Sequence, residues 1–170
     1  PESQQKILHY QKEIIGKSRN EKFTLIHKKI FGKEITKNEI NILNKKFKRI
    51  IISDLDNIKI FPKVKKNIEF LFEKKNIKLF CVSASPLDEL KMILKNNTID
   101  KYFIKIYGAP NKKKESFEDI RYITKLKYTK MLYIGDTQHD LTQSKKKKIN
   151  FLGFGNYVKW PTNINWIIKW

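Results

Sequence analysis

Apolar residues in the first third of the chain recur three and four positions apart, which is the spacing of one face of an α-helix. They predict three helices, over residues 7–15, 23–31 and 40–55. Gly16 and Gly32 follow the first two segments, at positions where glycine commonly ends a helix. Thr36 and Glu39 form a capping-box pattern ahead of the third. We therefore expect a unit of three helices over residues 1–58.

After residue 59, short apolar runs of strand length alternate with segments of helical spacing. The runs predict four strands, over residues 77–82, 103–107, 131–134 and 149–152. Helices are expected to begin at Pro62 and at Pro86, because the first turn of a helix accommodates proline. Strands that alternate with helices form βαβ units. We therefore expect an α/β fold with a Rossmann-like parallel sheet over residues 59–170, and the aromatic tail packed against it.

The composition fits a folded protein of a reducing cytoplasm. Hydrophobic residues make up 40% of the 170 positions, enough for a core. Cys81 is the single cysteine and lies in an apolar run, so no internal disulfide can form. No apolar run reaches membrane-spanning length, and no signal peptide is visible. We expect a cytoplasmic protein without a membrane partner.

The formal net charge of +20 points toward a nucleic-acid partner. Only three of the 37 basic residues are arginines, however, and arginine's planar fork is favoured in phosphate and base recognition. The lysines are spread through every segment, and the clusters at 112–114 and 145–148 are short. We interpret them as solvent-exposed charges and do not expect nucleic-acid binding. That alternative predicts an affinity that depends steeply on salt.

Candidate catalytic groups stand at the carboxyl ends of three predicted strands. They are Ser83 after the first strand, Lys113 just past the second, and the pair Asp136 and Asp140 after the third. Ligand chemistry in open α/β sheets takes place at this edge, so the groups are expected to converge. A hydroxyl, an ammonium group and carboxylates suited to Mg²⁺ are what phosphoryl transfer requires.

In this order the segments resemble three motifs of the haloacid dehalogenase-like (HAD) superfamily of phosphohydrolases. They are FCVSASP at residues 80–86 for the second motif, YGAPNKK at 107–113 for the third and LYIGDTQHD at 132–140 for the fourth. The resemblance implies that Ser83 and the adjoining Ala84 bind the phosphoryl group. It also implies that Lys113 neutralises the phosphoryl oxygens, with Lys114 as the alternative.

The same resemblance assigns the acids and the helical unit. It implies that Asp136 binds Mg²⁺ and that Asp140 supports the metal site or its loop. Residues 1–58 are similar to the family's small α-helical cap, and GKSRNEKF at residues 16–23 resembles a cap loop of phosphoglycolate-phosphatase-like members. Ser18 and Arg19 would then reach from the cap to a second anion of the substrate, although a plain surface turn fits this segment equally well.

One family feature is missing. The first motif, Asp-x-Asp-x-Thr or Asp-x-Asp-x-Val, should precede the cap and supply the nucleophile, but nothing before residue 16 resembles it. Asp54 and Asp56 form a lookalike, which we reject because Ile58 and Lys59 depart from the motif and a helical period runs through residues 40–55. We expect the chain to be a fragment that begins downstream of the true motif. The strand between those ending at Ser83 and at Gly135 would then be absent.

These observations predict a Mg²⁺-dependent phosphomonoester hydrolase of the HAD type. The full-length protein would act on a small phosphorylated metabolite through an aspartyl-phosphate, whereas this chain alone would be inactive and poorly stable. A non-catalytic HAD-like protein that binds phosphate or a partner in the same site is the alternative. The sequence does not determine which phosphate ester is used.

Overall fold

The computed structural model describes residues 2–61, 63–155 and 158–167. Its α-helices are α1 (Glu2–Glu13), α2 (Arg19–Phe31), α3 (Lys37–Ser53), α4 (Val64–Phe72), α5 (Leu87–Asn96), α6 (Lys113–Thr124) and α7 (Gln138–Lys147). Its strands are β1 (Phe80–Pro86), β2 (Lys105–Ala109), β3 (Leu132–Gly135), β4 (Asn150–Phe154) and β5 (Trp166–Ile167). Short 3₁₀ turns lie at Leu55–Asn57, Asp100–Tyr102 and Tyr128–Lys130.

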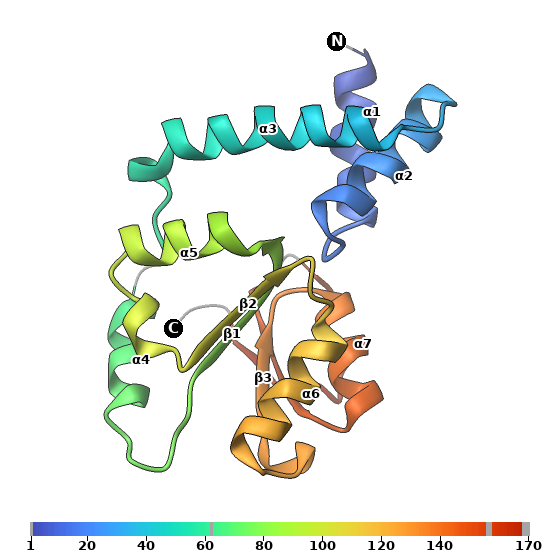
Figure 1. Cartoon of the computed structure of the whole chain (residues 1–170). Helices are drawn as coiled ribbons and strands as arrows, with labels where there is room; N and C mark the ends of the chain where they lie inside the picture. The colour runs from blue at the N-terminus through green and yellow to red at the C-terminus, as the bar shows by residue number, and fades with distance from the viewer. Residues whose placement is uncertain (1, 62, 156–157, 168–170) are drawn as a thin grey trace.

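Helices α1, α2 and α3 lie together beyond the carboxyl ends of the strands (Figure 1). The predicted capping box starts α3, because the Thr36 hydroxyl accepts a hydrogen bond from the Glu39 backbone N–H while the Glu39 carboxylate accepts one from Thr36. Gly32 ends α2 in the left-handed region with φ of 64°. These local signals explain why the helical predictions for this part of the chain are confirmed.

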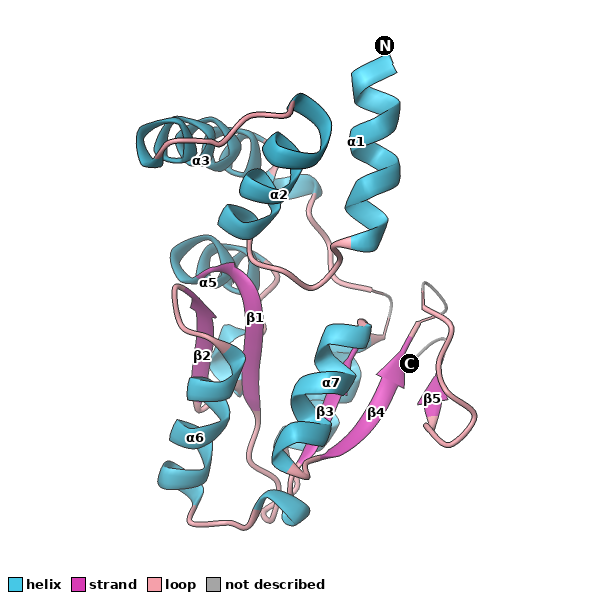
Figure 2. Cartoon of the chain, turned by 90° about the vertical axis from the view of Figure 1, so that its right-hand side faces the viewer, coloured by secondary structure: helices cyan, strands magenta, loops and turns pink. Residues whose placement is uncertain are grey.

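The strands form two separate parallel sheets within the described residues. In one sheet β1 pairs with β2, and in the other β4 lies between β3 and β5 (Figure 2). Strands and helices alternate along the chain, which confirms the predicted α/β class. The free edges of β1 and β3 are not paired with each other, so a slot separates the two sheets.

Two apolar clusters hold the helices on the strands. Tyr107 and Phe117 belong to a cluster that also contains Val82 and Tyr133, so α6 packs across both sheets and bridges them. The other cluster joins Leu90 and its neighbours on α5 to the β1–β2 sheet and to α4. The two sheets are therefore joined through α6, which packs against both of them, rather than by strand pairing.

Several predicted boundaries differ from the structure. The first strand runs over Phe80–Pro86 rather than over residues 77–82, so Ser83 lies within β1, at the irregularity between Val82 and Pro86, and not after the strand. Its pairing with β2 begins at Phe80 and Lys105, and before that only the Ile104 backbone N–H donates to the Leu79 carbonyl. Helix α5 begins at Leu87, one residue later than predicted. The two-residue strand β5 was not predicted, since only its pairing with β4 defines it. The predicted helix start at Pro62 falls outside the described residues.

None of the helices within residues 2–61, 63–155 and 158–167 is both long and apolar enough to cross a membrane.

Candidate active site

At the carboxyl ends of β1 and β3, the space between the two sheets widens into a cavity of about 530 Å³. We call this cavity the strand slot. Residues 82–86 of β1 form one wall, and residues 133–136 at the end of β3 form the other. Lys113 enters from the start of α6, and Phe23 and Ile26 of α2 face the slot from the helical unit. The structure thus brings Ser83, Lys113 and Asp136 to a single cavity, as their places at the strand ends predict.

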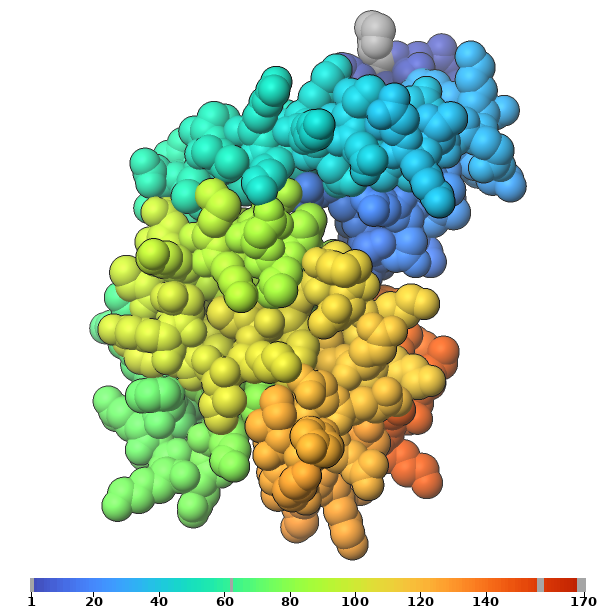
Figure 3. All heavy atoms as spheres, viewed as in Figure 1, coloured from blue at the N-terminus to red at the C-terminus, as the bar shows by residue number. Residues whose placement is uncertain are grey.

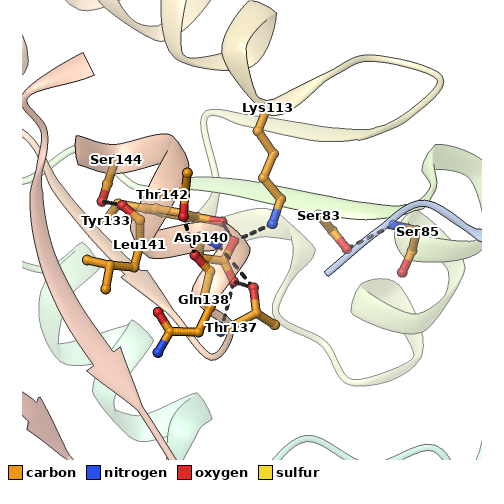
Figure 4. Close-up of polar contacts among 10 residues, drawn as sticks. All are labelled: Ser83, Ser85, Lys113, Tyr133, Thr137, Gln138, Asp140, Leu141, Thr142 and Ser144. Carbon is orange, nitrogen blue, oxygen red and sulfur yellow. Dashed lines mark hydrogen bonds and ion pairs between the residues drawn. The ribbon is translucent and has the colours of Figure 1, made fainter. Parts of the chain in front are cut away.

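Ser83 lies at the β1 wall of the strand slot, and its hydroxyl group can still donate a hydrogen bond to a ligand. Its Oγ accepts a hydrogen bond from the Ser85 backbone N–H over 3.1 Å (Figure 4). A hydroxyl can accept and donate at the same time, so the Ser83 proton remains available to an anion. Ala84 also lines the slot and places its backbone at the same wall.

Lys113 crosses from α6 to Asp140 on α7, and its ammonium group lies on the side of Asp140 that faces Ser83 (Figure 4). The side chains are 10% exposed for Lys113 and 3% for Asp140, so this ion pair is almost fully desolvated. An ammonium group has three donors, which leaves Lys113 able to contact a further anion. Lys114, the sequence alternative, does not line the strand slot.

Asp140 holds several neighbouring side chains in place by accepting their hydrogen bonds. Besides Lys113, its carboxylate accepts hydrogen bonds from the Tyr133 hydroxyl at 2.5 Å and from the Thr137 hydroxyl and backbone N–H at 2.6 and 3.1 Å. Burial alone would raise the pKa of Asp140, but the Lys113 ammonium and these hydrogen bonds outweigh it and lower the pKa. Asp140 is therefore ionised and fully engaged with protein donors.

Asp136 differs from Asp140 because its side chain is exposed at the rim of the slot. Partial desolvation and the nearby negative charge of Asp140 raise the pKa of Asp136 above its ordinary value. A cation would relieve this repulsion, so Asp136 suits the role of a Mg²⁺ ligand. Within the described residues no three acidic, histidine or cysteine side chains are grouped closely enough to hold a metal. Any ion bound here would need further ligands.

Gly135 allows Asp140 to fold back over the end of β3. A Cβ atom at Gly135 would lie 2.5 Å from Asp140 Cβ, a separation that real side chains do not tolerate. A second close approach joins the helical unit to α7, since a Cβ atom at Gly16 would lie 2.8 Å from His139 Cβ and 2.9 Å from Thr137 Oγ1. Gly16 thus lets the loop before α2 approach the start of α7, whereas Gly135 makes room for Asp140.

Ser18 and Arg19 lie where the predicted cap loop faces the strand ends. Both side chains already make hydrogen bonds to other side chains of the protein. Ser18 is the N-cap of α2, with its hydroxyl 2.6 Å from the Glu21 carboxylate. The Arg19 guanidinium makes two hydrogen bonds to Glu89 at the start of α5, at 2.8 and 2.5 Å. The guanidinium also stacks on the Phe47 ring, 4.2 Å from its centroid. Any contact of Arg19 with a ligand would use its remaining donors.

The lookalike pair Asp54 and Asp56 lies away from these residues. Asp54 ends α3 and accepts a hydrogen bond from Asn57, and the backbone carbonyl of Leu55 accepts one from Asn96 at the last turn of α5. The strand ends meet the opposite, first turn of that helix. Neither aspartate lines the strand slot, so the geometry gives them no access to a ligand held by Ser83.

Three residues of the site were not found from the sequence. Thr137 could have been, because Thr137 and Asp140 have the spacing of a capping box, which the structure contains. Tyr133 and Glu89 gave no signal, since their contacts with Asp140 and Arg19 depend on how the chain folds.

Solved structures with this fold match the chain at low sequence identity. A predicted phosphoglycolate phosphatase from Haemophilus somnus is 22% identical, with a TM-score of 0.70 over 89% of this chain and 70% of that one. A β-phosphoglucomutase from Clostridium difficile is 20% identical, with a TM-score of 0.73 over 88% and 70%. A haloacid dehalogenase-like family protein from Streptococcus pneumoniae is 17% identical, with a TM-score of 0.65 over 84% and 65%. Likeness at this identity establishes the fold alone.

The chain spans about two thirds of the length of these three proteins. No curated protein matches the sequence. The sequence model of the haloacid dehalogenase-like hydrolases, by contrast, matches residues 3–154, which is most of the chain. The chain therefore belongs to the haloacid dehalogenase-like hydrolase family.

Proposed function

We propose that this chain carries the phosphate-binding part of a Mg²⁺-dependent phosphomonoester hydrolase. The observation that supports this most is the convergence of Ser83, Lys113 and Asp136 on the strand slot. A phosphoryl group held there would meet a hydroxyl, a desolvated ammonium group and a carboxylate. The hydroxyl and the ammonium group would stabilise part of the negative charge on the transferring group directly, and the carboxylate would do so only through the Mg²⁺ that it holds. Such charge stabilisation is the main contribution of a protein to phosphoryl transfer.

Each residue has a separate role in the proposed site. The Ser83 hydroxyl donates a hydrogen bond to a phosphoryl oxygen, and the Lys113 ammonium neutralises the charge on the others. Asp140 holds Lys113 in place through the buried ion pair. Asp136 is the residue that would hold Mg²⁺, and the bound ion would supply further positive charge to the phosphoryl oxygens.

The reaction of such an enzyme passes through an aspartyl-phosphate, so it needs a carboxylate nucleophile. Among the described residues, the acids that line the strand slot are Asp136 and Asp140, and the latter is fully engaged. We infer that the nucleophile belongs on a strand placed between β1 and β3, where two free strand edges face the slot. This chain would then be a fragment that binds phosphate without turning it over.

Small phosphorylated compounds are the proposed substrates. The names of two similar structures, a phosphoglycolate phosphatase and a β-phosphoglucomutase, support this class. Their low identity leaves the choice of ester to the residues around the slot.

Phosphate binding by the purified chain tests the assignment. Isothermal titration calorimetry with inorganic phosphate and Mg²⁺ should show binding that Ser83→Ala and Asp136→Asn each weaken by about tenfold, the loss of one charged or polar contact. Asp54→Asn is the matched control and should leave the affinity unchanged. Equal affinities in all four proteins would refute the site.

Hydrolysis of p-nitrophenyl phosphate tests the inference about the nucleophile. We expect no turnover by the isolated chain. Turnover that disappears in Asp54→Asn would show that the lookalike motif is the true nucleophile and that our inference is wrong. A non-catalytic, phosphate-binding role remains the second candidate, favoured because the described acids of the slot are Asp140, which is fully engaged, and Asp136, which is assigned to the cation. Turnover that depends on Asp136 and not on Asp54 would exclude it.

A further inference from the structure

A larger cavity, of about 840 Å³, lies between the helical unit and the carboxyl ends of β1 and β2. The molecular surface is hollowed there, between the blue and cyan helices α2 and α3 and the yellow segment that joins β2 to α6 (Figure 3). It shares Ser83, Ala84 and Lys113 with the strand slot, so a ligand bound in the slot could extend into it. We call it the lysine cavity.

Basic side chains outnumber acidic ones on the walls of the lysine cavity. The acids are Glu21, Asp88 and Glu89. The basic residues are Arg19, Lys45, Lys48, Lys112, Lys113 and Lys114. His139 also lines the cavity, and partial burial and the Lys113 ammonium lower its pKa. Six cations against three anions leave the cavity with a net positive charge.

Protein groups already pair with half of these cations. Arg19 makes its two hydrogen bonds to Glu89 with side chains only 14% and 5% exposed. Lys48 forms an ion pair with Asp88, and Lys113 forms one with Asp140. The third acid of the lining, Glu21, accepts hydrogen bonds from Ser18 at the start of α2.

The other three cations, Lys45, Lys112 and Lys114, have no acidic partner within ion-pair distance in the described part of the chain. They come from two walls: Lys45 lies on α3, whereas Lys112 and Lys114 flank the start of α6. Glu115 of the same turn accepts the Lys112 backbone N–H at 3.0 Å, which fixes this segment. The nearby Glu118 forms its ion pair with Lys147, and the hydrogen bond from Lys147 and the weaker influence of the Lys114 charge lower the pKa of Glu118. Like charges that share a cavity repel, and an anion placed among them would relieve that repulsion.

We propose that Lys45, Lys112 and Lys114 form a subsite for a second anionic group of the substrate. The inference rests on the function proposed above, because the first phosphoryl group is taken to occupy the strand slot. The substrate is then a small phosphomonoester that carries a second phosphate or carboxylate at the far end of the molecule. This assignment moves the second-anion role from Arg19, which Glu89 neutralises, to three lysines contributed by both walls.

Matched alkyl phosphates test the subsite. The probes are butyl phosphate, butane-1,4-diol bisphosphate and 4-phosphooxybutanoate, titrated into the purified chain at low salt without metal. We expect the two probes with a second anion to bind about tenfold more tightly than butyl phosphate, the scale of a few partly screened charge interactions. Whichever of the two binds more tightly identifies the second anion as phosphate or carboxylate. The gain should shrink in 0.3 M salt, because ionic screening then acts within a few ångströms.

Two triple variants separate the subsite from the general charge of the protein. K45Q/K112Q/K114Q should lose most of the gain while affinity for butyl phosphate falls much less. K46Q/K145Q/K146Q changes the net charge equally with lysines outside the cavity lining, and it should keep the gain. Circular dichroism confirms that each variant is folded.

The possible failures are distinct. Equal affinity for the mono-anionic and bis-anionic probes, or equal loss in both triple variants, overturns the subsite. Butyl phosphate affinity that does not change in Ser83→Ala overturns the phosphoryl site in the strand slot instead. A bisphosphate that binds through the lysines alone, independent of Ser83, would also place the phosphoryl site elsewhere.

Discussion

Replacement of Asp140 by asparagine is the sharpest test of how the site is built. The substitution keeps the size of the side chain and removes its charge, which leaves the Lys113 ammonium without its anion. The exposed fractions of 3% for Asp140 and 10% for Lys113 mean that little water can replace the lost partner. Asp140 also accepts hydrogen bonds from Tyr133 and from both donors of Thr137, and these would be weakened or reoriented.

The expected cost follows from that burial. Breaking a buried ion pair by removing one partner costs about 3–5 kcal/mol, because the remaining charge stays desolvated. Domains of this kind unfold with a total free energy of about 5–15 kcal/mol, so Asp140→Asn removes a large share of the stability. With a typical urea dependence, the unfolding midpoint should fall by about 2 M.

Urea unfolding followed by circular dichroism measures this change. Glu118→Gln is the control, because it breaks a solvent-exposed pair with Lys147, and we expect a much smaller effect. The double variant Lys113→Met/Asp140→Asn removes both charges and should recover part of the loss. If Asp140→Asn costs no more than Glu118→Gln, or if the double variant is less stable than the single one, the reasoning about Asp140 as a buried anchor is refuted.

Low pH should weaken the same ion pair between Lys113 and Asp140, because it protonates the Asp140 carboxylate. The folded-state pKa of Asp140 is lowered from 3.8, so its contribution to stability is complete above that pH and is lost as the pH falls through the folded-state pKa. Asp140→Asn should therefore flatten the fall of the unfolding free energy at acidic pH. If the unfolding free energy of the variant falls with acid as steeply as that of the unsubstituted chain, the stability lost at low pH does not come from Asp140.

Three further outcomes are expected. Gly135→Ala forces Asp140 to move and should cost about 1–3 kcal/mol in urea unfolding while it weakens phosphate binding; unchanged values for both would contradict the close packing. Burial raises the pKa of the Cys81 thiol from 9.0 to about 11, so thiol reagents at pH 8 should react about 100-fold more slowly with the folded chain than with the urea-unfolded one, and equal rates would refute its burial. Ser18→Ala and Thr36→Ala each remove a capping box and should each lower the free energy of unfolding by about 1 kcal/mol with no phosphate present; a change confined to phosphate affinity would show instead that Ser18 serves the ligand.

The features that the sequence predicted correctly are those set by neighbours along the chain. Thr36 and Glu39 start α3 because a capping box needs residues three apart, and Gly32 ends α2 because it adopts the left-handed conformation. The apolar runs become strands in the predicted order, and their alternation with helices determines that the strands are parallel. Parallel strands in turn place Ser83, Lys113 and Asp136 at one edge.

Contacts between distant residues decided the rest. Arg19 meets Glu89 across 70 positions and Lys113 meets Asp140 across 27, and no local pattern encodes either pair. The pairing of strands likewise depends on which edges meet in space, which is why the separation into two sheets and the short strand β5 could be described only from the structure. The sequence by itself determined which groups stand at the strand ends. The tertiary structure decided which of their charges are already neutralised, because desolvation and charge pairing depend on distance in space and not on position along the chain.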